Sequence, residues 1–148
     1  MQQGFASVFD ALGRLPLSLH QFLFRLAVAG VFFRAGLTKV ASWGSTVALF
    51  RDEYKVPVLP PEVAAVMAST FELGCSFLLI VGFATRLATL PLLAIILTIQ
   101  LFVYPQAWPE HLVWASILLF LLTRGAGPIS IDRVISRFAG PAGAPAPR

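Results

Sequence analysis

Cysteine and charge are both scarce in this chain of 148 residues. Cys75 is the single cysteine, which excludes an intramolecular disulfide and a paired-cysteine redox relay. Any redox chemistry would therefore need a bound cofactor, a quinone or a partner protein. Charged residues make up only 12% of the chain, whereas 57% are hydrophobic. With a mean hydropathy of +0.81, this composition indicates an integral membrane protein rather than a soluble domain.

Runs of basic residues are also missing. The formal net charge is +4 and the isoelectric point is near 10.0. Three lysines or arginines never follow one another, however, and the basic residues flank apolar blocks. Such flanking is typical of membrane topology signals and not of a phosphate-binding surface. We therefore expect no nucleic acid among the partners.

Four apolar blocks have the length and composition of membrane-spanning or nearly spanning helices. They cover about residues 21–40, 62–83, 87–104 and 108–123. The predicted fold class is all-α: an integral membrane four-helix bundle over residues 21–138. Residues 1–20 are expected to be a cytoplasmic N-terminal segment, and the Pro/Gly/Ala-rich residues 139–148 a disordered tail.

A short amphipathic helix is predicted between the first two blocks. Trp43, Val47, Phe50 and Tyr54 recur at helical spacing and form one apolar face. We expect this helix to lie on the membrane surface, with Trp43 and Tyr54 at the level of the lipid headgroups.

Basic residues concentrate on the side of the bundle that carries both termini. That side holds Arg14, Arg25, Arg86, Arg124, Arg133, Arg137 and Arg148. The opposite side holds Lys39, Arg51 and Lys55 beside Asp52, Glu53, Glu62 and Glu110. The positive-inside rule predicts a multi-pass protein of the bacterial inner membrane with both termini in the cytoplasm.

Glu72 and Arg34 are the candidate catalytic residues, because both interrupt apolar blocks. Glu72 would lie about 15 Å inward from Glu62, and Arg34 about 9 Å inward from Val40, so the arginine side chain could reach the carboxylate. An ion pair would let both charges exist in lipid. The pair is either a structural salt bridge or the centre of a pocket for a quinone or a small anion; both interpretations stay open.

Five further residues are candidates for substrate binding, each with a structural alternative. Lys39 could close the mouth of the pocket or anchor the end of its helix. Arg86 could contribute to the pocket or act as a topology signal. Gln100 could bond across helices, Trp114 could line the pocket or pack, and His111 could serve a site at the outer face.

Haem and metal sites find little support in the sequence. His20 and His111 are the only histidines, and they belong to opposite sides of the predicted bundle. One haem with two histidine ligands inside a single subunit is therefore not expected, and no metal site is predicted. Cys75 follows Glu72 on nearly the same helix face, where a packing role is favoured over a chemical one.

Several motifs resemble the DoxX family of small four-span membrane proteins over about residues 22–137. They are Arg25-Leu-Ala-Val-Ala-Gly-Val-Phe-Phe-Arg34-Ala-Gly-Leu-Thr-Lys39, Glu72-Leu-Gly, Gly82-Phe-Ala-Thr-Arg86 and Gly125-Ala-Gly-Pro-Ile-Ser-Ile-Asp132-Arg. The family is named for the membrane subunit of a thiosulfate:quinone oxidoreductase, and other members are described as partners in oxidative-stress complexes. The resemblance implies that Arg34, Lys39, Glu72 and Arg86 correspond to the charged motif residues of the family.

The expected function is thus a membrane component of a redox or stress-response system with a polar Arg/Glu pocket. Quinone is the candidate cofactor, and an enzymatic role would be that of a quinone-linked oxidoreductase subunit. Expected partners are the lipid bilayer, a periplasmic or membrane protein and further copies of the chain. The alternatives are a non-enzymatic scaffold that docks a partner and an oligomeric transporter of small solutes or metals.

Overall fold

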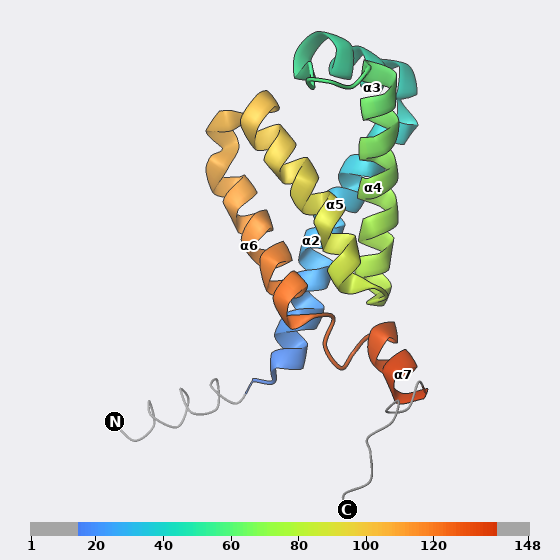
Figure 1. Ribbon diagram of the computed structural model, residues 1–148, viewed down its shortest axis with the longest axis vertical. Coiled ribbons are helices and arrows are strands. Elements are labelled where there is room, and N and C mark those ends of the chain that lie inside the picture. Colours follow the sequence, from blue (N-terminus) through green and yellow to red (C-terminus); the bar gives the residue numbers. More distant parts are fainter. Residues whose placement is uncertain (1–14, 139–148) are drawn as a thin grey trace, which may run out of the picture.

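The computed structural model describes residues 15–138, and six α-helices form most of this part (Figure 1). The helices are α2 (Leu17–Ala41), α3 (Trp43–Leu49), α4 (Pro61–Val81), α5 (Thr85–Thr98), α6 (Trp108–Arg124) and α7 (Ile131–Phe138). Residues 15–138 contain no strand, which confirms the all-α prediction. The predicted disordered tail, residues 139–148, lies outside the described residues, as do residues 1–14.

Two helices of the described part are long and apolar enough to cross a membrane. One is α4, with 21 residues, and the other is α5 together with the π-helical turn η2 (Ile99–Val103), with 19 residues. Helix α2 has 25 residues but carries Arg25, Arg34 and Lys39. Helix α6 has 17 residues and is about 26 Å long, slightly less than the bilayer core.

Local sequence explains where α4 ends and α5 begins. Pro61 opens α4, where its missing N–H would have no partner in any case. Gly82 adopts the left-handed conformation, with φ of 69°, and closes the helix. The Asp132 carboxylate then accepts hydrogen bonds from the backbone N–H groups of Ala84 (2.7 Å) and Thr85 (3.1 Å), so α7 caps the start of α5.

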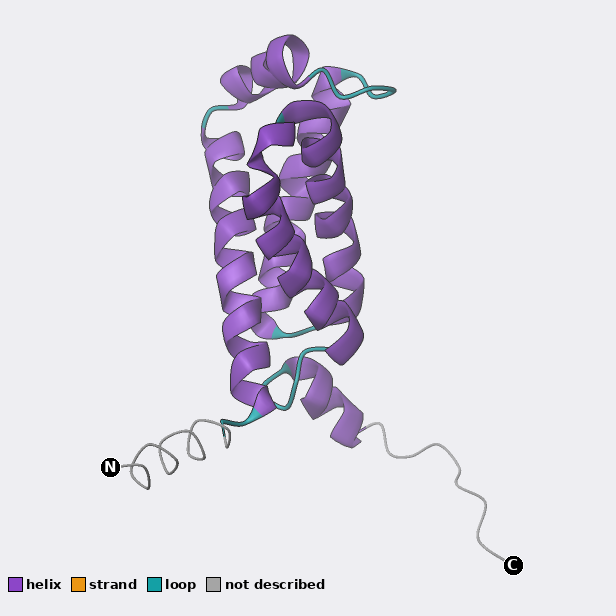
Figure 2. Ribbon diagram, turned by 90° about the vertical axis from the view of Figure 1, so that its left-hand side faces the viewer, coloured by secondary structure: helices purple, strands orange, loops and turns teal. Residues whose placement is uncertain are grey.

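The long helices form two antiparallel pairs, α2 with α4 and α5 with α6 (Figure 1). The pairs meet near the α4–α5 turn and diverge toward α3. We call the end with the start of α2, the α4–α5 turn and α7 the terminal end, and the opposite end the cap end (Figures 1 and 2). The core fills the space between the pairs: Val28, Ala29, Phe32, Cys75, Leu79, Ala88, Leu92, Ile96, Leu118 and Leu121.

The segment between α2 and α4 consists of α3 and the π-helical turn η1 (Phe50–Tyr54), which we call the cap segment. Its apolar face forms as predicted, and much of that face packs against α4. Phe50 is buried against Ala64 and Ala65, whereas Trp43 at the start of the segment is exposed. The small alanine side chains let the cap segment approach α4 closely.

Arg25 and Gln21 fasten the chain after α6 to the terminal end of α2. Arg25 is 1% exposed and donates a hydrogen bond to the carbonyl of Ile129. Gln21 donates to the carbonyls of Arg124 (3.2 Å) and Gly125 (3.3 Å). Both side chains therefore bind backbone acceptors, which supports a structural role at this end.

Candidate functional site

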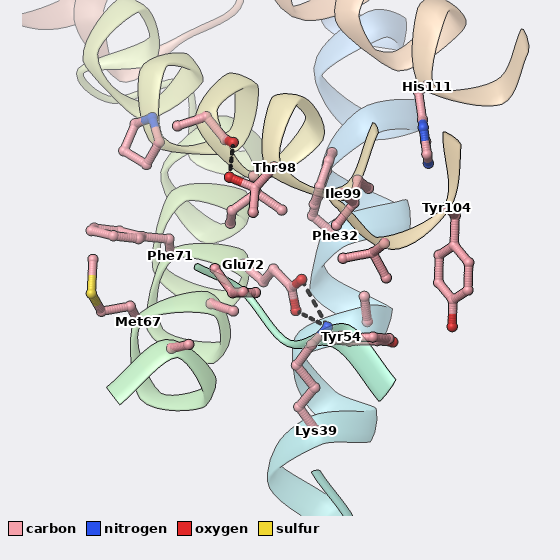
Figure 3. Close-up of a pocket in the computed structure, with 18 of the residues that line it drawn as sticks. Phe32, Lys39, Tyr54, Met67, Phe71, Glu72, Thr98, Ile99, Tyr104 and His111 are labelled. Atoms are coloured by element: carbon pink, nitrogen blue, oxygen red, sulfur yellow. Dashed lines mark hydrogen bonds and ion pairs between the residues drawn. The ribbon is translucent and has the colours of Figure 1, made fainter. Parts of the chain in front are cut away.

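A cavity of about 490 Å³ lies between the two helix pairs on the side of the cap segment (Figure 3). All four long helices and the cap segment contribute to its wall. Most lining side chains are apolar, and the polar or ionisable ones are Lys39, Tyr54, Glu72, Thr98, Tyr104, Glu110 and His111. The volume and the few polar groups in an apolar wall are typical of small-molecule sites.

Lys39 and Glu72 form an ion pair in the wall of this cavity. The Lys39 Nζ atom donates to Glu72 Oε1 at 2.8 Å and to Oε2 at 2.7 Å. The Glu72 side chain is 5% exposed and the Lys39 side chain 17%. A buried charge needs such a partner, because transfer out of water without one is strongly unfavourable.

Gly36 explains why α2 and α4 approach closely at this level. A Cβ atom on Gly36 would lie 2.7 Å from Leu73 Cγ and 3.2 Å from Glu72 Cβ. The missing side chain thus leaves room for α4 beside α2. Lys39, one turn further along α2, then reaches the carboxylate.

The expected pairing of Arg34 with Glu72 is wrong, because Lys39 is the partner of Glu72. Arg34 is exposed, does not line the cavity, and takes part in neither of the two salt bridges among the described residues. Arg34 and Lys39 point about 140° apart on the helix, since five residues rotate the chain by about 500°. The position of Arg34 along α2 was compatible with a contact to Glu72, but its side chain projects from a different side of the helix.

His111 and Gln100 form a second polar group at the cavity. His111 Nδ1 lies 2.7 Å from Gln100 Oε1, and Gln100 Nε2 donates to the carbonyl of Pro105 at 2.9 Å. The His111 ring is 5.7 Å from that of Trp114, which in turn contacts Phe32 at 5.8 Å between ring centroids. His111 and Trp114 line the cavity, whereas Gln100 reaches it only through His111.

Two tyrosines that were not among the predicted site residues close the cavity at the cap end. Tyr54 comes from the cap segment and Tyr104 follows η2, and their ring centroids lie 5.8 Å apart. The Tyr104 hydroxyl donates to Glu53 Oε1 at 2.7 Å. This hydrogen bond raises the pKa of Tyr104, and burial raises the pKa of Tyr54. The only sequence signal for either tyrosine was the helical spacing that places Tyr54 on the apolar face of the cap segment. That spacing does not indicate that the Tyr54 ring contacts the ring of Tyr104.

Arg86, the remaining predicted binding residue, lies far from the cavity. It belongs to the first turn of α5 at the terminal end, and its guanidinium donates to the carbonyl of Thr123 at 3.2 Å. The structure therefore does not bring Arg86 together with Lys39 and Glu72. A helix-end contact between α5 and α6 accounts for its position.

The remaining candidates lie apart from the cavity. Cys75 is buried in the core, where it packs as a small apolar side chain. His20 is in the first turn of α2 and contacts the Pro16 carbonyl, at the opposite end of the bundle from His111. Within residues 15–138, no group of three His, Cys, Asp or Glu side chains is placed to hold a metal ion.

Comparison with known proteins gives one match. A family model described as DoxX matches residues 20–105. This stretch runs from α2 to the start of the short helix η3 (Pro105–Ala107) and includes Lys39 and Glu72, whereas His111 and Trp114 follow it. No curated protein and no solved structure matches the chain significantly.

Proposed function

Since the chain belongs to the DoxX family of membrane proteins, we propose that it is a membrane component of a redox or stress-response system whose cavity binds a quinone-type ligand. The observation that carries the proposal is the Lys39–Glu72 ion pair in the wall of a 490 Å³ cavity that is otherwise mostly apolar. An ammonium group beside an apolar cavity suits the carbonyl oxygen of a hydrophobic ring. Lys39 has three N–H donors and gives two of them to Glu72, so the third is available to such an oxygen.

The position of the cavity supports a ligand that arrives from the bilayer. Its wall includes Met67 and Phe71 of α4 and Ile95 of α5, and these are the two helices apolar enough to cross a membrane. The helix pairs diverge at this level (Figure 1). A lipid-soluble ligand can therefore insert its apolar part between the pairs and present its polar atoms to Lys39.

The proposed topology has four spans, with α2 and α6 as the first and fourth. Arginines gather at the terminal end, where α2, the start of α5, the end of α6 and α7 carry Arg25, Arg86, Arg124, Arg133 and Arg137. By the positive-inside rule this end faces the cytoplasm of a bacterial inner membrane. The cap segment and the cavity then belong to the outer half of the bilayer.

A partner-docking scaffold is the second candidate, and one observation favours it. The loop between the cap segment and α4 carries Val58, a residue that is 99% exposed and whose φ of 74° is unusual for a β-branched residue. An exposed apolar tip of this kind suits a contact with another protein. In this alternative the Lys39–Glu72 pair only joins α2 to α4.

The test is to purify the protein gently in nanodiscs and to measure bound quinone by native mass spectrometry and solvent extraction. The decisive variant is Lys39→Met with Glu72→Gln, because it removes both charges together and leaves neither one unpaired. The matched control is Arg51→Met with Glu62→Gln, which removes the exposed ion pair outside the cavity. We expect quinone in the wild type and the control and its loss in the cavity variant. Equal amounts in all three would mean that the Lys39–Glu72 pair does not hold the quinone, and no quinone in any of them would leave the scaffold as the better explanation.

A further inference from the structure

The hydrogen bonds of Gln100 fix which nitrogen of His111 carries a proton. The carbonyl of Pro105 can only accept, so the Gln100 amide must present its NH₂ group there. The Gln100 oxygen then faces His111 Nδ1 and can itself only accept, so Nδ1 must donate. In the neutral ring, the lone pair therefore lies on Nε2.

The Nε2 atom of His111 has no protein partner at the cavity among the described residues. Within residues 15–138 it makes no hydrogen bond, yet it is not one of the fully buried polar atoms that lack a partner. The residue as a whole is only 5% exposed and lines the cavity. Figure 3 shows its ring extending from α6 toward Tyr104. A hydrogen-bond acceptor thus faces an apolar space in which no protein donor meets it.

Among its polar groups, the cavity therefore offers a free donor and a free acceptor on different helices, α2 and α6. The free N–H of Lys39 is the donor, beside Glu72, and His111 Nε2 is the acceptor. In the view of Figure 3, Phe32 and Ile99 lie between the two places, so the wall between them is apolar. A ligand that matches this pattern is an apolar ring with an acceptor oxygen on one side and a hydroxyl on the other.

Resting on the proposed function, we infer that the cavity selects a hydroxyl-bearing amphiphile, and hence the quinol form of a quinone-type ligand over the oxidised form. A quinol can donate to His111 Nε2 and still accept from Lys39. A quinone has only acceptor oxygens and would leave Nε2 without a partner. Gln100 acts as a positioning residue, because it sets the tautomer without touching the ligand.

The tautomer is tested first, on ligand-free protein. Because His20 and His111 are the only histidines, His20→Gln leaves a single imidazole, whose two nitrogens are observed by ¹⁵N NMR at pH 8. We expect a protonated, pyrrole-type Nδ1 and an unprotonated, pyridine-type Nε2. Gln100→Met removes the hydrogen bond that keeps the proton on Nδ1, so the two tautomers should exchange. A protonated Nε2 in the protein with Gln100 intact would overturn the inference.

The ligand preference is tested by equilibrium dialysis of nanodiscs against decyl-ubiquinol, kept reduced without oxygen, and against decyl-ubiquinone. We expect the quinol to bind about two- to tenfold more tightly, the range of one net hydrogen bond. His111→Phe should abolish that preference, whereas His111→Gln, whose amide oxygen can accept, should retain part of it. Unfolding temperatures of the variants verify that they are folded.

The outcomes separate the inference from the proposed function. If both forms bind equally to the wild type, or if His111→Phe keeps the preference, the inference fails and quinone binding stands. If neither form binds, the proposed function and the ligand class fail together, and the NMR result remains a property of the protein alone.

Discussion

At the scale of single residues, Glu72 depends on Lys39 remaining beside it. Glu72→Gln would leave the ammonium of Lys39 next to a neutral amide in an apolar wall. Breaking a buried ion pair in this way costs about 3–5 kcal/mol, and we expect the lower part of that range because Lys39 retains some exposure. Chemical unfolding in detergent micelles measures the loss.

The control for this prediction is the second salt bridge of the described residues, between Arg51 and Glu62. Their side chains are 57% and 56% exposed, so solvent already screens the pair. Glu62→Gln should therefore leave the free energy of unfolding unchanged within error. A similar loss in both variants would mean that burial does not set the strength of the Lys39–Glu72 pair.

The sequence predicted one member of this pair correctly and assigned it the wrong partner. Glu72 stood out because it interrupts an apolar block, and it does lie in the cavity wall. The choice of Arg34 relied on depth along the helix, which is read from residue numbers. Direction around the helix depends on which face of α2 meets α4, and Gly36 marks that face. A helical-wheel projection of α2, with Gly36 placed at the centre of the face toward α4, would have favoured Lys39 over Arg34 as the partner of Glu72.

At the scale of helices, Gly36 controls the distance between α2 and α4. Gly36→Ala would place a methyl group 2.7 Å from Leu73 Cγ and 2.9 Å from its Cδ2 atom. Because Glu72 Cβ is also only 3.2 Å away, the helices must separate. We expect a destabilisation of about 1–3 kcal/mol, the usual cost of overpacking, together with weaker ligand binding.

Gly30 on the same helix provides the matched control. A Cβ atom there meets nothing within 4 Å, so Gly30→Ala adds no clash. Since alanine is the better helix former, the variant should be unchanged or stabilised by up to about 1 kcal/mol. Thermal unfolding of the two variants side by side makes the comparison. Equal behaviour would show that the α2–α4 contact tolerates a methyl group.

The cap segment is expected to respond to alkaline pH. Tyr54 and Tyr104 are the only tyrosines, and the pKa of each is raised above its ordinary value of about 10. The neutral phenol is therefore the form that the fold favours. Its contribution to stability is present below the ordinary pKa and is lost as the pH rises through the raised value.

Tyrosinate absorbance during a pH titration measures this effect. The folded protein should ionise at higher pH than the protein unfolded in denaturant, and Tyr104→Phe should leave one delayed step from Tyr54. Identical titration curves for the folded and unfolded protein would contradict the contacts between the cap segment and Tyr104.

The helices themselves could be predicted from the sequence, but their irregular turns could not. Each expected apolar block holds a helix, because length and composition suffice for that assignment. The π-helical turns η1 and η2 have no comparable signature. They nevertheless bring Tyr54 and Tyr104 together across the cavity, which is why both residues were missed.

At the scale of the whole molecule, the cavity results from how two helix pairs diverge. The core residues hold the pairs together toward the terminal end, and Tyr54 bridges to Tyr104 at the cap end. Between these contacts the pairs leave a space large enough for a ligand. The sequence predicted a polar pocket between helices. Spacing along the chain carries no information about the angle between helix pairs, however, so the volume of the cavity could not be predicted.

The orientation of the whole molecule can be tested with single cysteines. Because Cys75 is the only natural cysteine, Cys75→Ala gives a background without thiols. Val58→Cys reports on the cap end and Phe138→Cys on the terminal end, since these residues are 99% and 88% exposed. The proposed topology, with four spans and the positive-inside orientation, predicts that the terminal end faces the cytoplasm.

A membrane-impermeant maleimide should therefore label Val58→Cys in spheroplasts and Phe138→Cys only after lysis. The reverse pattern would keep the four spans and invert the positive-inside assignment, which would move the Lys39–Glu72 cavity to the cytoplasmic half. Labelling of both sites before lysis would contradict the proposed topology, in which the bilayer separates α3 from α7. The two sites together thus decide from which half of the membrane a ligand reaches the cavity.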